Sequence, residues 1–145
     1  MKKNDIVPSE REWLVMETVW NGTDGITSAE IVKELQDGHG VTERTVRVLL
    51  TRLIGKGLLR AERDKQDGRV YHYYAMKDRA SCLKAKETQF VDAYYHGSKS
   101  GAVMSLIEDT DLSEEQIQEL RKLLSKCDLF ASGKKLAHGQ GTISL

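Results

Sequence analysis

The sequence predicts a mainly α-helical protein with one small β-hairpin. Apolar side chains recur every three or four residues over most of the first 57 positions, which is the period of an amphipathic helix. The pattern changes to strand-like segments over residues 58–74 and then returns to the helical period. Aromatic residues make up only 6% of the 145 residues, so Leu, Val and Ile provide most of the apolar surface and an all-β sandwich is disfavoured.

A capping box opens each of the first two predicted helices. Ser9 is followed by Glu12, and Thr27 by Glu30, at the spacing where each pair can satisfy free backbone amides reciprocally. The first helix is expected to run to about Trp20, before an Asn-Gly pair. Each helix has an apolar face, formed in the first by Trp13, Met16 and Trp20 and in the second by Ile31, Val32 and Leu35.

Residues 42–57 predict a third helix with two contrasting faces. Thr42 can cap its amino end, and Gly57 suits the left-handed backbone that follows a last helical turn. One stripe is apolar and is expected to be buried: Val46, Leu49, Leu50, Leu53 and Ile54. At about 100° per residue, the opposite face carries Arg44, Arg47, Val48, Thr51 and Arg52. Such a face is usually only solvated, so the flanking segments decide its role.

Two strands around a polar turn follow this helix, over residues 58–63 and 69–74. Three helices and then a hairpin are the order of a winged helix-turn-helix domain, in which the third helix enters the major groove of DNA and the hairpin lies along the backbone. The cations of the hairpin are then expected to contact phosphates: Arg60, Arg63, Lys65 and Arg69. The alternative for each is an ordinary charge that keeps an exposed sheet edge from pairing.

The charge of the chain is unevenly distributed, although its formal net charge is zero. Residues 40–90 hold twelve Lys and Arg against six Asp and Glu, whereas the remaining residues hold ten against sixteen. Salt screens interactions beyond about 8 Å, so a phosphate responds to the local charge rather than to the sum. The basic region surrounds the predicted third helix and hairpin, which favours a nucleic-acid partner.

From Asp78 onward the helical period returns, and Ser113 with Gln116 is expected to cap a last helix. These helices have no large domain to cover, so a second copy of the chain is the simplest partner. We expect a homodimer that buries Phe90, Tyr94, Val103, Leu106, Ile107, Ile117, Leu120 and Leu124. The alternative is that the helices fold back on their own winged domain. The expected division is a winged domain at 1–77, a dimerisation region at 78–127 and a disordered tail at 128–145.

The sequence contains no motif typical of catalysis, phosphate binding or metal coordination, so no enzyme activity, metal or cofactor is expected. The histidines are scattered, and His72 on the hairpin is expected to be solvated or bonded to backbone. Cys82 and Cys127 are expected to be thiols that pack on helices. With no apolar run typical of a signal peptide and no 18 consecutive apolar residues, a cytoplasmic protein without membrane contact is expected.

Several strings of the sequence together resemble the penicillinase-repressor (BlaI/MecI/CopY) family of winged-helix repressors. The most specific is the pattern TVRxLLTRLxxKG, which spans Thr45 to Gly57. The matching strings are SEREWLVMETVW at 9–20, TSAEIVKEL at 27–35, TERTVRVLLTRLIGKGLL at 42–59, YHYYA at 71–75 and DLSEEQIQELRKLL at 111–124. The resemblance implies a homodimeric transcriptional repressor that binds a short inverted-repeat operator in double-stranded DNA.

Carried over onto this chain, the resemblance implies major-groove residues and one residue nearer the backbone, Arg52. The major-groove residues are Thr42, Arg44, Thr45, Arg47 and Thr51. Either Arg44 or Arg47 can donate a bidentate pair of hydrogen bonds to guanine, and Val48 can pack against a thymine methyl group. The competing interpretation is a winged-helix module whose arginines bind an acidic protein partner rather than DNA.

The inducer or antirepressor is left open by the sequence. One branch of the family is relieved by proteolysis at an Asn-Phe pair, and the aligned residues here are Ser105 and Leu106. Another branch responds to copper through carboxy-terminal CxC motifs, of which only Cys127 remains here. The operator sequence and the regulated genes are not encoded in any recognisable pattern.

Overall fold

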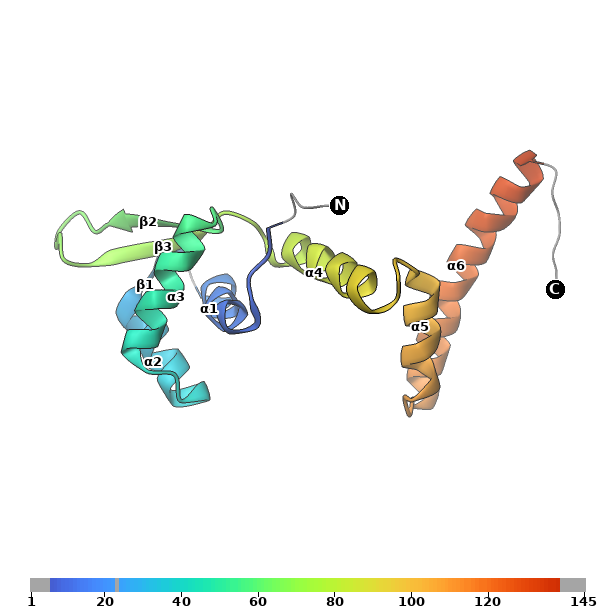
Figure 1. Ribbon diagram of the computed structural model, residues 1–145, viewed down its shortest axis with the longest axis horizontal. Coiled ribbons are helices and arrows are strands. Elements are labelled where there is room, and N and C mark those ends of the chain that lie inside the picture. Colours follow the sequence, from blue (N-terminus) through green and yellow to red (C-terminus); the bar gives the residue numbers. More distant parts are fainter. Residues whose placement is uncertain (1–5, 23, 139–145) are drawn as a thin grey trace. The chain divides into compact units, whose positions relative to one another are not determined.

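The computed structural model describes residues 6–22 and 24–138, which fall into two compact units (Figure 1). The first unit ends at Lys99 and the second begins at Ser100. Within the described residues, no helix combines the length and the apolar character needed to cross a membrane.

The first unit contains the three helices and the hairpin that the sequence predicts. They are α1 (Glu10–Asn21), α2 (Ser28–His39), α3 (Glu43–Gly55), β2 (Leu59–Arg63) and β3 (Tyr71–Ala75). A further strand, β1 (Ile26–Thr27), pairs with the free edge of β3, which gives an antiparallel sheet of order β1-β3-β2. The winged helix-turn-helix fold is therefore confirmed. The sequence does not reveal β1, because two residues are too few to show alternation.

The predicted starts of α1 and α2 are confirmed by their caps. The Ser9 hydroxyl accepts the Glu12 amide at 3.2 Å, while Oε1 of Glu12 accepts the Ser9 amide at 2.9 Å. Thr27 and Glu30 form the same reciprocal pair at the start of α2. Two orphan amides are thereby satisfied at each helix start, and the chain direction there is fixed by local sequence.

Helix α3 begins and ends where the sequence predicts. The Thr42 hydroxyl accepts the Thr45 amide at 3.2 Å, and Gly57 has a φ of 78° just after the helix. That left-handed conformation is strained for residues with a side chain, so glycine there allows the chain to leave α3 and enter β2.

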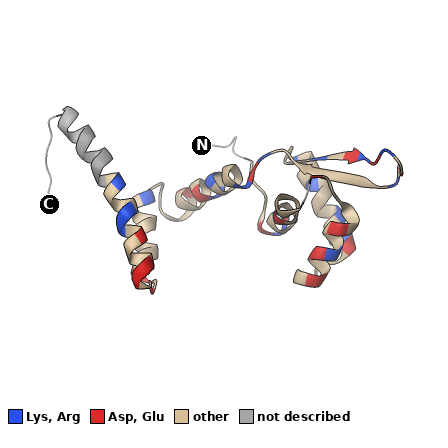
Figure 2. Cartoon of the chain, turned by 180° about the vertical axis from the view of Figure 1, so that it is seen from behind, with Lys and Arg blue, Asp and Glu red and all other residues tan. Residues whose placement is uncertain are grey.

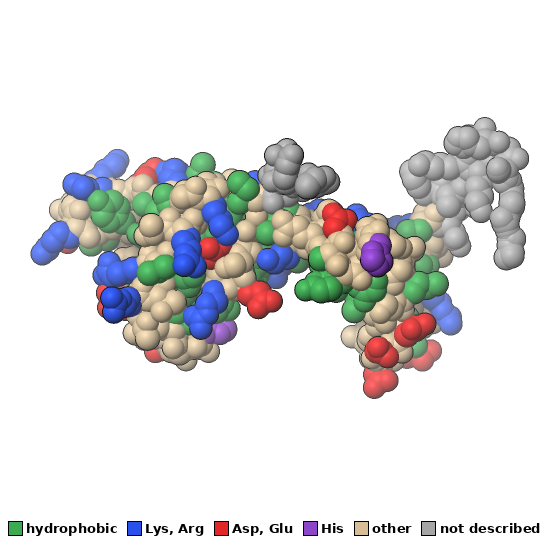
Figure 3. Space-filling view, in the orientation of Figure 1, with side chains coloured by type: hydrophobic (Ala, Val, Ile, Leu, Met, Phe, Trp, Pro, Cys, Tyr) green, Lys and Arg blue, Asp and Glu red, His purple; other side chains and the backbone are tan. Residues whose placement is uncertain are grey.

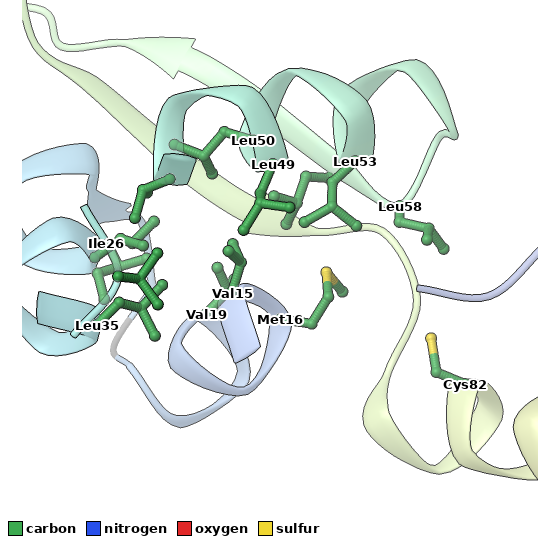
Figure 4. Close-up of a cluster of buried hydrophobic side chains, with 14 residues drawn as sticks. Val15, Met16, Val19, Ile26, Leu35, Leu49, Leu50, Leu53, Leu58 and Cys82 are labelled. Atoms are coloured by element: carbon green, nitrogen blue, oxygen red, sulfur yellow. The ribbon is translucent and has the colours of Figure 1, made fainter. Parts of the chain in front are cut away.

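The apolar stripe of α3 lies at the centre of the hydrophobic core (Figure 4). Four of its five predicted members are buried: Val46, Leu49, Leu50 and Leu53. They share the core with α1 and α2 side chains, namely Val15, Met16, Val19, Ile31 and Leu35. The prediction for Ile54 is wrong, since 41% of its surface is exposed. At about 100° per residue, Ile54 lies at the margin of the stripe rather than in its middle.

A buried carboxylate joins the start of α1 to the end of α3. The side chain of Glu12 is only 3% exposed, and its Oε1 lies 2.6 Å from Nζ of Lys56, which also donates to the Val7 carbonyl at 3.4 Å. Burial alone would raise the pKa of Glu12, but the hydrogen bonds from Lys56 and the Ser9 amide outweigh it and the pKa is lowered. Glu12 thus stays ionised and binds both elements.

Helix α4 (Arg79–Tyr94) belongs to the first unit and packs against its winged fold through its amino-terminal half. Cys82 is buried in the core, which confirms its expected packing role. A guanidinium nitrogen of Arg79 lies 3.0 Å from the Glu17 carboxylate, and Nζ of Lys86 donates to the Pro8 carbonyl at 2.8 Å. The position of α4 on the winged fold is therefore fixed by apolar burial, an ion pair and a hydrogen bond.

The second unit consists largely of α5 (Lys99–Glu108) and α6 (Glu114–His138). The Ser113 hydroxyl accepts the Gln116 amide at 3.1 Å, which confirms the predicted cap. Figure 2 shows acidic residues in the first turns of α6, where Glu114 and Glu115 interact favourably with the helix dipole.

The end of the chain differs in one respect from the prediction made from the sequence. Helix α6 continues to His138, so the tail that was expected to be disordered from residue 128 is helical for part of its length. The glycine at 133 marked this segment as a tail, but Ala, Leu and Lys dominate around it and favour a helix. Residues 139–145 lie outside the described part, and the functional division at residue 77 stays a prediction.

Replacing Lys56 with Met should destabilise the protein, because the methionine keeps the apolar stem and leaves the Glu12 carboxylate buried without its cation. We expect a loss of about 2 kcal/mol in the free energy of unfolding in urea. The matched control is Lys33→Met, which removes an exposed i,i+4 pair with Asp37 and should cost less than about 0.5 kcal/mol. Equal effects of the two variants would contradict the structural role of the buried pair.

Candidate DNA-binding surface

The outer face of α3 combines cations with one apolar side chain. Arg44, Arg47, Thr51 and Arg52 are all exposed, and Val48 between them is 46% exposed. Because the opposite face of the helix is anchored in the core, the direction of these side chains is set by packing. A rigid helix with guanidinium groups and a methyl-bearing side chain on its free face can read both hydrogen-bonding groups and thymine methyl groups in a major groove.

Arg47 is held by an intramolecular partner. Its guanidinium donates to the Glu43 carboxylate from Nη2 at 2.7 Å and from Nε at 3.1 Å. Thr51 donates its hydroxyl proton to the Arg47 carbonyl at 3.0 Å, which leaves its oxygen able to accept from a ligand. Both partners of the Arg47–Glu43 pair are more than half exposed, so the ion pair is weak. The Arg47 guanidinium can therefore leave the Glu43 carboxylate and bind a base or phosphate at little cost in free energy.

The two threonines at the start of α3 face each other rather than solvent alone. The Thr42 hydroxyl donates to the Thr45 hydroxyl at 3.1 Å and accepts the Thr45 amide. Thr42 is exposed, whereas Thr45 is half-buried beside the helix start. The start of α3 is thus held in a defined geometry at a point where a phosphate can approach.

Tyrosines support the arginines of the hairpin. The Arg60 guanidinium lies 4.4 Å from the ring centre of Tyr74 and also pairs with Glu62. Arg63 lies 5.5 Å from the ring of Tyr71 and donates to its hydroxyl at 3.0 Å. Stacking on a ring restricts a long side chain while leaving its charge available. These contacts between arginines and tyrosine rings were not predicted from the sequence, although Arg and Tyr residues on two paired strands are a usable signal for them.

The remaining predicted wing cations, Lys65 and Arg69, lie in and beside the hairpin turn and are exposed. Nε of Arg69 lies 3.2 Å from the Asp67 carboxylate. In the space-filling view, Lys and Arg side chains gather over α3 and the hairpin of the first unit (Figure 3). The structure therefore brings all the predicted DNA-binding residues onto α3 and the hairpin, while their individual roles stay predictions.

The cysteines differ in their surroundings. Cys82 is buried, and desolvation raises the pKa of its thiol. Cys127 is exposed on α6, so its expected packing role is wrong for the single chain. Among the described side chains, those of residues 6–22 and 24–127, no cluster of three or more His, Cys, Asp or Glu is arranged to hold a metal ion.

Comparison with known proteins places the chain in a family. Residues 8–126 match the family model described as penicillinase repressor. The chain belongs to the penicillinase repressor family. It is 30% identical over 118 residues to the methicillin resistance regulatory protein MecI of Mammaliicoccus sciuri, a match that covers 81% of this chain and 93% of that protein. It is also 30% identical over 118 residues to the penicillinase repressor of Bacillus licheniformis, with 81% and 89% covered.

Two solved structures of BlaI also resemble this chain. The DNA-binding domain of the repressor BlaI is 32% identical, with 56% of this chain and 93% of that domain covered and a TM-score of 0.46. The monomeric form of Bacillus licheniformis BlaI in complex with the blaP half-operator is 30% identical, with 53% and 89% covered and a TM-score of 0.45.

Membership of this family confirms the function class that the sequence predicts. The penicillinase repressors are DNA-binding transcriptional repressors rather than enzymes. This chain is accordingly a DNA-binding transcriptional repressor.

Lys65 is expected to contact a phosphate without reading sequence. Lys65→Ala should therefore weaken binding to an operator and to a scrambled duplex by similar factors, and should lower the slope of log affinity against log salt by about 0.9. Fluorescence anisotropy at several salt concentrations measures both quantities. Lys84→Ala, on the exposed surface of α4, is the matched control and should leave the slope unchanged. An unaltered salt slope in Lys65→Ala would contradict the assignment.

Proposed function

We propose that this repressor acts as a homodimer that binds a short inverted repeat, with α3 in the major groove and the β2–β3 hairpin on the backbone. The observation that carries the proposal is the α3 helix, which has one face buried in the core and one face of exposed Arg, Thr and Val. A repressor of this kind acts where the chromosome lies, so the expected cytoplasmic location belongs to the same proposal.

Within this arrangement, base reading falls to the middle of the exposed face. Arg44 and Arg47 are long enough to reach guanine edges, and Val48 between them offers a contact for a thymine methyl group. Thr42, Thr45 and Thr51 add hydroxyl groups that can donate or accept. Arg52 and the hairpin cations at 60, 63, 65 and 69 then hold phosphates, which fixes the register but not the sequence.

The dimer is supported by apolar side chains that remain exposed in the single chain. In the first unit these are Phe90 and Tyr94 at the end of α4. In the second unit Val103, Leu106 and Ile107 of α5 and Leu124 of α6 are exposed, and Ile117 and Leu120 are half-buried. Leu106 is 57% and Leu124 51% exposed, values that a stable monomer seldom tolerates for so many neighbouring apolar residues.

A two-fold symmetric dimer would also explain how the protein recognises an inverted repeat. A closed dimer uses the same surface on both copies, so two copies of α3 are presented in a fixed relation. Each copy then reads one half of an inverted repeat, with half-sites separated by about one helical turn of DNA. Once one copy of the dimer has bound its half-site, the second copy binds intramolecularly, so the dimer binds the whole operator more tightly than a single copy binds a half-site.

Arg47→Ala should weaken binding to the operator by on the order of 1 to 3 kcal/mol and should relax discrimination at one base pair. An operator first has to be selected from random duplexes with the full-length protein, and affinities are then measured by gel-shift titration. Arg11→Ala, on the exposed surface of α1, is the control and should bind as the unmodified chain does.

The same titration tests the proposal as a whole. Equal affinity of the unmodified protein for the operator and a scrambled duplex would contradict sequence-specific reading by α3. A stoichiometric complex with an acidic protein, without affinity for duplexes even at low salt, would favour a protein-interaction module instead.

Leu124→Glu should weaken the homodimer at least tenfold, about 1.4 kcal/mol, because a carboxylate would have to be buried in an apolar interface. Sedimentation velocity over a range of protein concentrations measures the dissociation constant, and operator affinity should fall in parallel. The control is Met76→Glu, a 54% exposed residue between β3 and α4. A dimer unaffected by Leu124→Glu, or a monomer of the unmodified protein at micromolar concentration, would contradict the assignment.

A further inference from the structure

His72 is the second residue of β3 and lies opposite Thr27 of β1 and Glu62 of β2. Its imidazole ring reaches two groups on either side of the strand. Nδ1 lies 2.6 Å from the carbonyl oxygen of Gly25, and Nε2 lies 2.8 Å from Oδ1 of Asp64. The ring therefore bridges the loop before β1 and the turn of the hairpin.

The chemistry of the two partners determines the charge of the ring. A carbonyl oxygen and a carboxylate oxygen can only accept hydrogen bonds, whereas a neutral imidazole has a single N–H to donate. Both contacts are made only when Nδ1 and Nε2 each carry a proton, which is the imidazolium form. The carboxylate is itself kept ionised, because Oδ2 of Asp64 accepts the amides of Gln66 and Asp67 at 2.9 Å each.

The surroundings of the ring also favour the charged form. The Gly25 carbonyl and then the Asp64 carboxylate raise the pKa of His72 above its ordinary value, with a smaller contribution from Glu30 of α2. The hydrogen bond from His72 in turn lowers the pKa of Asp64. Other ionisable groups beside the ring and the turn include Glu62 and Arg63 of β2 and Tyr74 of β3. The turn itself carries Lys65, Asp67 and Arg69.

Both partners of the ring are held in place by their own backbone. Asp64 accepts two amides of the turn, and its own amide donates to the Val70 carbonyl at 2.8 Å, so this residue organises the hairpin turn. Gly25 has a φ of 77°, and a Cβ there would lie 2.7 Å from the Tyr74 hydroxyl. The Gly25 carbonyl therefore has a position that other residues would not easily reproduce.

We propose that His72 is the positioning residue of the wing: its imidazolium ties the hairpin turn to the loop before β1, and DNA affinity falls when the ring loses its proton. The inference rests on the proposed contact between the hairpin and the DNA backbone. Loss of the proton leaves one acceptor facing a nitrogen lone pair, so the bridge opens at one end and the turn with Lys65 and Arg69 gains freedom.

The direction of the pH effect follows from the two shifts. A raised pKa means that His72 contributes fully below its ordinary value of 6.5 and that the contribution disappears as pH rises through the raised pKa. A lowered pKa means that Asp64 contributes above its ordinary value of 3.8 and loses that contribution as pH falls through the lowered pKa. The bridge is thus complete in mildly acid solution and is lost on the alkaline side.

The test combines NMR of the full chain with DNA binding between about pH 6 and about pH 9, on the alkaline flank of histidine titration. The His72 ring signals should titrate above the ordinary pKa, and the amide signals of Gln66 and Asp67 should follow the same midpoint. Affinity for a selected operator, measured by anisotropy, should fall by about fivefold across this range with that midpoint.

Three variants separate positioning from simple structural support. Asp64→Asn can donate its amide N–H to a neutral Nε2, while Nδ1–H still donates to Gly25, so this variant should keep the wing ordered and lose the pH dependence of DNA affinity. His72→Gln should bind more weakly at the acid end and without pH dependence. His39→Gln, on an exposed histidine at the end of α2, should retain the profile of the unmodified chain.

The outcomes distinguish this inference from the proposed function. A normal or lowered pKa of His72, or an unchanged pH profile in Asp64→Asn, would overturn the bridge. If Lys65→Ala weakens DNA binding but neither pH nor His72→Gln does, the inference is overturned and the hairpin contact stands. If neither Lys65→Ala, nor His72→Gln, nor a change of pH alters DNA affinity, the hairpin contact itself is overturned together with the inference.

Discussion

Packing of the apolar stripe of α3 against α1 and α2 is the interaction on which the rest of the structure depends. Four side chains from Val46 to Leu53 are buried, and this fixes which face of the helix remains for a ligand. The buried pair of Glu12 and Lys56 adds an electrostatic tie at the end of the same helix. A helix held in this way can present arginines in one direction, which sequence-specific reading requires.

Several arginines on and around α3 are paired with nearby carboxylates. Arg47, Arg60 and Arg69 each have a carboxylate within the same element or turn, at Glu43, Glu62 and Asp67. Because these ion pairs are exposed, breaking them in favour of a phosphate costs little free energy. They orient the arginines and still leave them able to bind a phosphate. The positive charge of the region therefore coexists with a neutral chain, and the local arrangement rather than the total charge suits a nucleic acid.

The two ends of α4 have different surroundings. Arg79, Cys82 and Lys86 attach α4 to the winged fold, whereas the end of α4 and both helices of the second unit expose apolar side chains. The same helix is thus anchored at one end and available for a partner at the other.

Local sequence determined the helices, their caps and the hairpin, because capping boxes at Ser9 and Thr27 and the stripe from Val46 to Leu53 act over neighbouring residues. The family strings likewise lie in one element or in neighbouring ones, since the string at 42–59 runs from α3 to the first residue of β2. Tertiary structure alone decided the strand β1, the exposure of Ile54, the pairing of Glu12 with Lys56 and the bridge through His72. Each of these features joins residues far apart in the chain or depends on which side chains pack against a residue in the folded protein. The periodicity of apolar residues reports neither of these.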